Sequence, residues 1–167
     1  MKQYRELCED ILKYGERKED RTGVGTLSLF GLQSRYDLQE GFPLLTLKKT
    51  NMNLITSELL WFIKGDSNIR YLLKHNNTIW TDWAFKNYIQ SDEYKGSIDV
   101  ELLNSQDKAV QKMVQDEMRE FESKILNNKE FGDKWGELGR VYGKQWRDWK
   151  KGLDESIDQL KNAIEML

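Results

Sequence analysis

One short stretch combines residue types that suit the wall of a binding pocket. The sequence GELGRVYGKQWRDW, residues 136–149, holds three glycines, three aromatic residues and three cations. A surface loop does not need two Trp and a Tyr, and a core strand does not need Arg140, Lys144 and Arg147. Aromatic faces stack on flat rings, and Arg and Lys bind anions. The stretch is therefore typical of a pocket for a flat, polar, anionic ligand.

A second candidate for chemistry is Glu58, an acid among apolar residues. Residues 52–64, MNLITSELLWFIK, have the pattern of an apolar helix that ends at Gly65. Glu58 falls on or beside the apolar face, with Leu54 and Phe62. A carboxylate there costs several kcal/mol unless it is paired, hydrogen-bonded or protonated. Two interpretations stay open, an acid that moves protons near neutral pH or one half of a structural ion pair.

A glycine-rich loop precedes the first predicted strand. Residues 20–26, DRTGVGT, fit neither the Walker A spacing nor G-x-G-x-x-G. Arg21 in this loop could clamp a phosphate, because a guanidinium group binds two oxygens at once and keeps its charge. The alternative interpretation is a turn that leads into a strand.

Aromatic pairs and the single cysteine have simpler interpretations beside their chemical ones. Trp80 with Trp83, and Trp146 with Trp149, form two aromatic edges that can stack on a planar heterocycle, although core packing is the commoner use. Cys8 lies on the apolar stripe of a predicted helix, which favours a small buried hydrophobe over a reactive thiol.

The amino-terminal elements follow from the spacing of apolar residues. Residues 2–14 repeat apolar side chains at helical spacing, and Gly15 stops the predicted helix. Residues 26–38 alternate, which predicts one long bent strand or a pair, with a bulge at Gly31. Residues 41–43, Gly-Phe-Pro, then turn the chain.

Three further helices are predicted downstream. One covers about residues 67–75. A longer one covers residues 105–126, with apolar residues on one side and charged residues on the other side, which faces solvent. Ser156 with Gln159 forms a capping box for the last helix. No stop signal follows before Leu167, so the chain is expected to end inside a helix.

Composition excludes several classes of protein. The chain has 167 residues, which suits one domain, and a net charge of −2 from 26 basic and 28 acidic residues. That charge gives no support for binding nucleic acid or an anionic membrane. One cysteine allows no internal disulfide, which favours the cytoplasm, and with one histidine no zinc site can be assembled. No segment reads as a signal peptide or a membrane span.

The predicted strands are too few for a stable sheet. One isolated strand or hairpin is not stable in water, so other strands should be supplied from elsewhere. We therefore expect an α+β fold in which helices pack on a bent, largely antiparallel or mixed sheet that is incomplete in this chain.

Five motifs carry a resemblance to a known family. They are DRTGVGTLSLFG (20–31), GFPLLTLKK (41–49), SELLWFIKGDSNIRYL (57–72), TIWTDWAF (78–85) and VYGKQWRDW (141–149). In this order, and over nearly the whole chain, they resemble the amino-terminal half of thymidylate synthase.

The resemblance implies a partial enzyme. It implies one partial thymidylate synthase-like domain over 1–167, with the helical insertion of the longer bacterial members at about 86–134. The family's nucleophile, the Cys of a Pro-Cys-His motif, belongs beyond these motifs, and without a nucleophile the reaction has no first step. The chain alone is therefore expected to be inactive. Its expected partner is a complementary carboxy-terminal half or an intact synthase subunit, since the intact family forms homodimers.

The resemblance also assigns roles to residues. The family methylates dUMP to dTMP, with 5,10-methylenetetrahydrofolate as carbon donor and reductant, and no metal. It implies that Arg21 binds the nucleotide phosphate, that Glu58 organises the water network that relays protons, and that Tyr142 helps to remove a proton from the base.

The folate site is implied in the same way. Ile79, Trp80 and Trp83 would line the folate pocket, and Lys48 would meet the anionic tail of the folate. The sequence departs from the family at a usual His, here Leu32.

Two alternatives to a partial synthase remain. The first is a non-catalytic module that binds nucleotide or folate or serves in dimerisation. The second is a pyrimidine hydroxymethylase, whose distinguishing residues lie mostly downstream.

Overall fold

The computed structural model describes residues 2–20, 23–152 and 155–167. It divides into two compact units, Met1–Asn51 and Met52–Leu167, which are described separately.

The first unit consists of one helix, one hairpin and a long irregular segment. Helix α1 (Lys2–Tyr14) has the predicted bounds. Strand β1 (Glu16–Lys18) pairs antiparallel with β2 (Thr26–Ser28). None of the residues described in this unit is buried. Cys8 is accordingly half-buried on α1 rather than fully enclosed, and its thiol is free.

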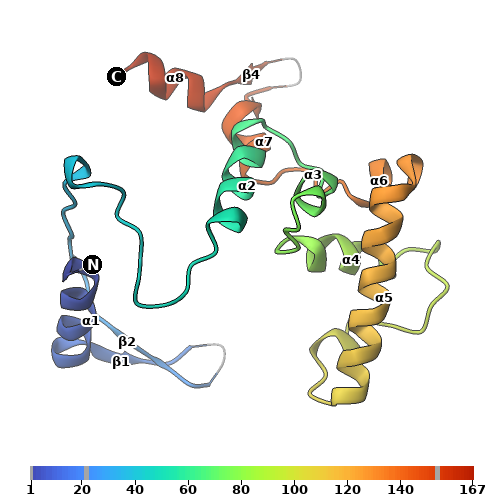
Figure 1. Ribbon diagram of the computed structural model, residues 1–167, viewed down its shortest axis with the longest axis horizontal. Coiled ribbons are helices and arrows are strands. Elements are labelled where there is room, and N and C mark those ends of the chain that lie inside the picture. Colours follow the sequence, from blue (N-terminus) through green and yellow to red (C-terminus); the bar gives the residue numbers. More distant parts are fainter. Residues whose placement is uncertain (1, 21–22, 153–154) are drawn as a thin grey trace. The chain divides into compact units, whose positions relative to one another are not determined.

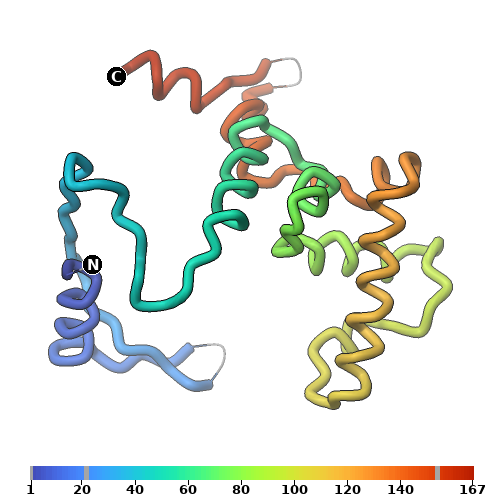
Figure 2. The backbone as a smooth tube through the Cα atoms, in the orientation of Figure 1, coloured from blue at the N-terminus to red at the C-terminus, as the bar shows by residue number. Residues whose placement is uncertain are grey.

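The strand predicted over 26–38 is wrong beyond Ser28. From there the chain turns at Gly31, where φ is 78°, and stays irregular apart from the 3-10 turn η1 (Leu38–Glu40), as Figure 2 shows. Alternating side chains suit a half-buried sheet, but a strand forms only where its backbone finds a partner. In the described part of this unit, β1 pairs with residues 26–28 and offers no pairing partner to the residues that follow them.

The second unit is mainly helical (Figure 1). Its elements in chain order are α2 (Met52–Ile63), α3 (Arg70–Lys74), α4 (Thr81–Ile89), η2 (Leu102–Asn104), α5 (Lys108–Asn127), α6 (Lys129–Trp135), α7 (Tyr142–Arg147), β3 (Trp149–Lys150), β4 (Ser156–Ile157) and α8 (Gln159–Glu165). Strands β3 and β4 pair antiparallel. Helices with two small antiparallel sheets agree with the predicted α+β class and its incomplete sheet.

Two predicted helix starts are wrong for local reasons. Helix α3 begins at Arg70 rather than near residue 67, because the Asn68 side chain accepts a hydrogen bond from the Arg70 amide at 2.9 Å and Asn68 forms a β-bridge with Glu137. Helix α8 is capped by Asp158, whose carboxylate accepts from the Lys161 amide at 2.9 Å. The predicted cap, Ser156, lies in β4 instead.

Two hydrophobic clusters form the core of this unit. The larger contains Ile69, Leu73, Ala84, Phe85, Ile89, Ile98, Val114, Phe121 and Ile125. Its last three members are the apolar side of α5, so this helix packs into the unit while its charged side faces solvent, as predicted. The smaller cluster joins Trp61, Phe62 and Leu72.

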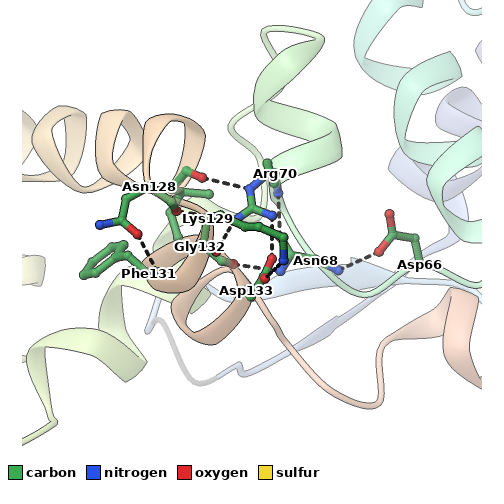
Figure 3. Close-up of polar contacts among 9 residues, drawn as sticks. Asp66, Asn68, Arg70, Asn128, Lys129, Phe131, Gly132 and Asp133 are labelled. Atoms are coloured by element: carbon green, nitrogen blue, oxygen red, sulfur yellow. Dashed lines mark hydrogen bonds and ion pairs between the residues drawn. The ribbon is translucent and has the colours of Figure 1, made fainter.

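Arg70 connects α3 with α5 and α6. Its guanidinium group donates to the carbonyl oxygens of Ile125 at 2.9 Å and Lys129 at 2.8 Å, and pairs with Asp133 at 2.6 Å (Figure 3). Cations at a helix carboxyl end satisfy carbonyls that have no partner within the helix. Arg70 thus fixes the end of α5 and the start of α6 against α3.

Within the described ranges, no helix is long and apolar enough to cross a membrane.

Candidate functional site

Glu58 is held by an indole group. Its side chain is half-buried on α2, and Trp80 Nε1 donates a hydrogen bond to Glu58 Oε1 over 2.7 Å. No ion pair between residues that the structure describes includes Glu58. The acid is therefore satisfied by a hydrogen bond, and the alternative of a structural ion pair is not seen.

Tyr142 is linked to Glu58 through Trp80, in a cluster of aromatic rings. It begins α7 and meets Phe62 edge-on, with ring centroids 5.4 Å apart, and Trp80 at 6.1 Å. Gly143 allows this approach, since a Cβ there would lie 2.8 Å from the Cα and carbonyl oxygen of Phe62. Tyr142 is 55% exposed, so its ring borders the cluster and reaches solvent.

Trp83 and Ile79 extend the same apolar surface. The Trp83 ring lies 6.4 Å from the Trp80 ring, at an interplanar angle of 39°. Trp83 is 63% exposed and Ile79 is 47% exposed. These side chains therefore offer open apolar surface next to Trp80, on which a flat ring can stack.

Asn77 positions this surface and was not found from the sequence. It is 1% exposed, and its amide donates to the Leu54 carbonyl at 3.0 Å and to Ser57 Oγ at 2.9 Å. Its side-chain oxygen accepts from the Ile79 amide at 3.2 Å. Asn77 thereby ties the turn before Trp80 to α2. The available signal was the Asn-Asn pair after α3, since Asn76 has φ 53°, a backbone conformation that favours Asn.

The cation Arg147 has a structural use. Its guanidinium group donates to the Ile63 carbonyl at 3.0 Å and pairs with Asp158 at 2.9 Å. In the same helix, Trp146 meets Phe62 at 5.5 Å. Arg147 thus fixes α7 against the end of α2, which differs from the predicted contact with an anionic ligand.

The rest of that stretch borders a cavity of about 210 Å³. Its lining residues are Arg140, Lys144, Gln145, Asp148, Trp149 and Lys150. Hydrogen bonds from Lys144 and Ser156 lower the pKa of Asp148 to about 2, so Asp148 stays ionised. Two of the three cations, Lys144 and Lys150, pair with Asp148 at 2.9 Å and 3.5 Å, so a pocket wall for an anionic ligand stays a prediction.

Two further predicted site residues belong to the first unit, Met1–Asn51. Arg21 lies outside the described residues. Lys48 is exposed in the first unit, where Thr50 Oγ1 donates to the Lys48 carbonyl at 3.4 Å. In the part of the chain that is described, no group of three or more His, Cys, Asp and Glu side chains is placed to hold a metal ion.

Comparison with known proteins decides the family. The sequence profile of thymidylate synthase matches residues 2–167. The chain belongs to the thymidylate synthase family. It is 52% identical over 169 residues to the thymidylate synthases of Listeria monocytogenes serotype 4b and Listeria innocua serovar 6a, which covers 100% of this chain and 54% of each relative. The chain therefore spans about half the length of these thymidylate synthases.

Proposed function

We propose that this chain supplies one part of a thymidylate synthase site, which converts dUMP to dTMP with 5,10-methylenetetrahydrofolate as carbon donor and reductant. The observation that carries the proposal is the hydrogen bond between Glu58 and Trp80 beside Tyr142, in a chain 52% identical to thymidylate synthases. An acid, a phenol and open aromatic faces suit proton transfer next to a flat ring.

Glu58 and Tyr142 are the proposed catalytic residues. The indole of Trp80 holds Glu58 Oε1 and so orients the carboxyl group. We assign the relay of protons through water to the pyrimidine to its second oxygen, Oε2. General acid–base groups must be held in place in this way to act in the transition state. The Tyr142 hydroxyl assists removal of the proton from the base.

The remaining residues are proposed to bind the two substrates. Ile79, Trp80 and Trp83 form the apolar surface for the folate, and the exposure of Ile79 and Trp83 supports that role. Lys48 takes the anionic tail of the folate, and Arg21 takes the phosphate of dUMP. We assign the reaction to the cytoplasm, because a chain with one cysteine does not depend on an oxidising compartment.

A complementary part of the fold is proposed to complete the site. The outer side of α2 is apolar and open to solvent, with Met52, Ile55, Leu59, Leu60 and Ile63 each between 37% and 46% exposed. A helix that is apolar all round is normally enclosed, and the relatives are about twice as long as this chain.

We assign this cover to the carboxy-terminal half of the synthase fold, which would also bring the attacking thiol. Residues 1–167 then form a partial domain, with the 86–134 region as an insertion. An intact synthase subunit is the other partner that could provide this half.

Co-expression tests the proposal. The chain is produced together with the carboxy-terminal part of the Listeria monocytogenes relative that lies beyond the match, and dTMP formation is measured from dUMP and methylenetetrahydrofolate. We expect turnover from the co-purified pair and none from either part alone. A stable complex without turnover, or turnover by the chain alone, would contradict the proposal.

A further inference from the structure

One buried side chain, Asn77, bridges α2 and the turn that leads into α4. It is 1% exposed. Its amide nitrogen donates to the Leu54 carbonyl at 3.0 Å and to Ser57 Oγ at 2.9 Å, both on α2. Its side-chain oxygen accepts from the Ile79 amide at 3.2 Å, beyond the turn. Both N–H donors and the oxygen of this amide are therefore in use.

Ser57 is arranged to receive this contact. It is 3% exposed, and its hydroxyl donates to the Asn53 carbonyl, one turn earlier in α2, at 2.7 Å. A serine that bonds to its own helix in this way keeps an oxygen lone pair for another donor, here the amide of Asn77. The Asn53 side chain also donates to the His75 carbonyl at 2.9 Å, so a second contact ties α2 to the same turn.

The two ends of this bridge lie next to the two partners of the candidate acid's hydrogen bond. Ser57 directly precedes Glu58, and Ile79 directly precedes Trp80. The Trp80 indole donates to Glu58 across 22 residues of sequence. One side-chain hydrogen bond does not fix the backbones that carry its two partners, but the buried bridge at Asn77 does. Displacement of a catalytic group by about 1 Å lowers a rate by about 10²-fold, so this support matters for proton transfer.

We propose that Asn77, through Ser57, is a positioning residue that sets the geometry between Glu58 and Trp80 and thereby the proton relay. The inference rests on the proposed function, because Glu58 is the acid assigned there. Asn77 is too deeply buried to touch a substrate, so it acts through Glu58. The alternative role, support of the fold alone, predicts different results in the two measurements below.

The first measurement follows the Trp80 indole in the chain itself by NMR. The chain has six Trp, and among their indole N–H signals the one that is lost in Trp80→Phe belongs to Trp80. Glu58→Gln should move this signal, because an amide is a weaker acceptor than a carboxylate. With Asn77→Ala also present, Glu58→Gln should no longer move it, since the two side chains are not held together. Ser57→Ala, which removes one acceptor and suits a helix, should weaken the response in the same direction.

Asn68→Ala is the matched control. The Asn68 side chain also joins distant elements, since it donates to the Gly132 carbonyl at 2.8 Å and accepts from the Arg70 amide at 2.9 Å. Its loss should destabilise the fold, as loss of Asn77 does. It should leave the response of the Trp80 signal to Glu58→Gln intact.

The second measurement tests the consequence for the reaction in the co-expressed pair. Asn77→Ala should lower kcat by about tenfold to 10²-fold. In the Glu58→Gln background it should have no further effect on kcat, because residues that act as one unit do not contribute additively. If Asn77 supported the fold alone, it would lower kcat by the same factor in both backgrounds.

The outcomes separate this inference from the proposed function. An equal response of the Trp80 signal to Glu58→Gln in the unaltered chain, Asn77→Ala and Ser57→Ala would overturn the inference, as would no response in the unaltered chain. If Asn77→Ala does not fold, Ser57→Ala decides between these outcomes. The signal is read without the carboxy-terminal half, so turnover of the pair would still support the proposed function. Conversely, a response that depends on Asn77 supports the positioning role even if the pair has no turnover.

Discussion

At the level of single residues, three polar side chains of the second unit are held by backbone or indole groups. Glu58 accepts from Trp80, Asn77 contacts the backbone of α2, and Arg70 donates to backbone carbonyls of α5 and α6. A buried polar group that loses its partner costs more than the same hydrogen bond contributes. Substitutions at these residues should therefore have effects well above those at exposed ion pairs.

Arg70→Lys tests this expectation. Lysine has one ammonium group and cannot reproduce the planar set of donors that contacts Ile125, Lys129 and Asp133. We expect the free energy of unfolding to fall by about 1–3 kcal/mol, measured by urea denaturation. Arg119→Lys is the control, since Arg119 is 73% exposed and its guanidinium group pairs with the exposed Asp116. Equal effects of the two substitutions would contradict this role of Arg70.

Tyr94 should make stability depend on pH in the alkaline range. Burial, and then its hydrogen bond to Glu117, raise the pKa of Tyr94 to about 12, from an ordinary value of about 10. The folded state thus favours the neutral phenol, so its contribution to stability is complete below about pH 10 and is lost as the pH rises toward about 12. Unfolding free energies of Tyr94→Phe should fall less steeply over this range. Parallel pH profiles would argue against it.

Among the secondary-structure elements, α1 and α2 were predicted closely, whereas the strand was not and α4, α6 and α7 were not predicted as helices. The bounds of α1 agree with the prediction, and α2 agrees within one residue, because an apolar stripe and a following glycine are local signals. The strand predicted over 26–38 needed a second strand to pair with, and the local sequence pattern does not show whether such a strand is present. In the same way, the indole that holds Glu58 lies 22 residues away in the sequence. The spacing of apolar residues therefore identified Glu58 as a candidate acid, but it did not identify Trp80 as the hydrogen-bond partner of Glu58.

Close contact between α7 and α2 gives a prediction at this scale. Gly143→Ala would place a Cβ 2.8 Å from backbone atoms of Phe62, which cannot move aside as a side chain can. Overpacking of this kind costs about 1–3 kcal/mol, and it should shift Tyr142 away from Trp80. Thermal unfolding checks the effect. Gly152→Ala, with no atom within 4 Å of the added carbon, should be nearly neutral, and an equal loss would contradict the packing account.

At the scale of the whole molecule, exposed apolar surface is the main feature of each unit. The first unit has no buried residue among those described, and the second exposes the outer side of α2. Monomeric soluble proteins rarely leave large contiguous apolar surfaces open. Such surfaces favour association with the carboxy-terminal half or, in its absence, with another copy of the chain.

A double substitution on α2 tests this association. Ile55→Lys with Leu59→Lys changes two exposed side chains, so the unfolding free energy should change by no more than about 1 kcal/mol. Sedimentation velocity at micromolar concentration should show self-association of the unaltered chain and a shift toward monomer in the variant. Leu126→Lys, on α5 and 39% exposed, should not shift it. A monomeric unaltered chain would contradict the expectation.

The most direct test of the central claim uses one fused chain. Residues 1–167 are joined to the carboxy-terminal part of the Listeria monocytogenes relative, and kcat for dTMP formation is compared between Glu58 and Glu58→Gln. The amide can still accept the hydrogen bond from Trp80 but cannot act as an acid. We predict that the fusion is active and that Glu58→Gln lowers kcat by about 10²–10⁴ with unchanged stability. Equal kcat values for the two fusions would contradict the claim that Glu58 handles protons in this site.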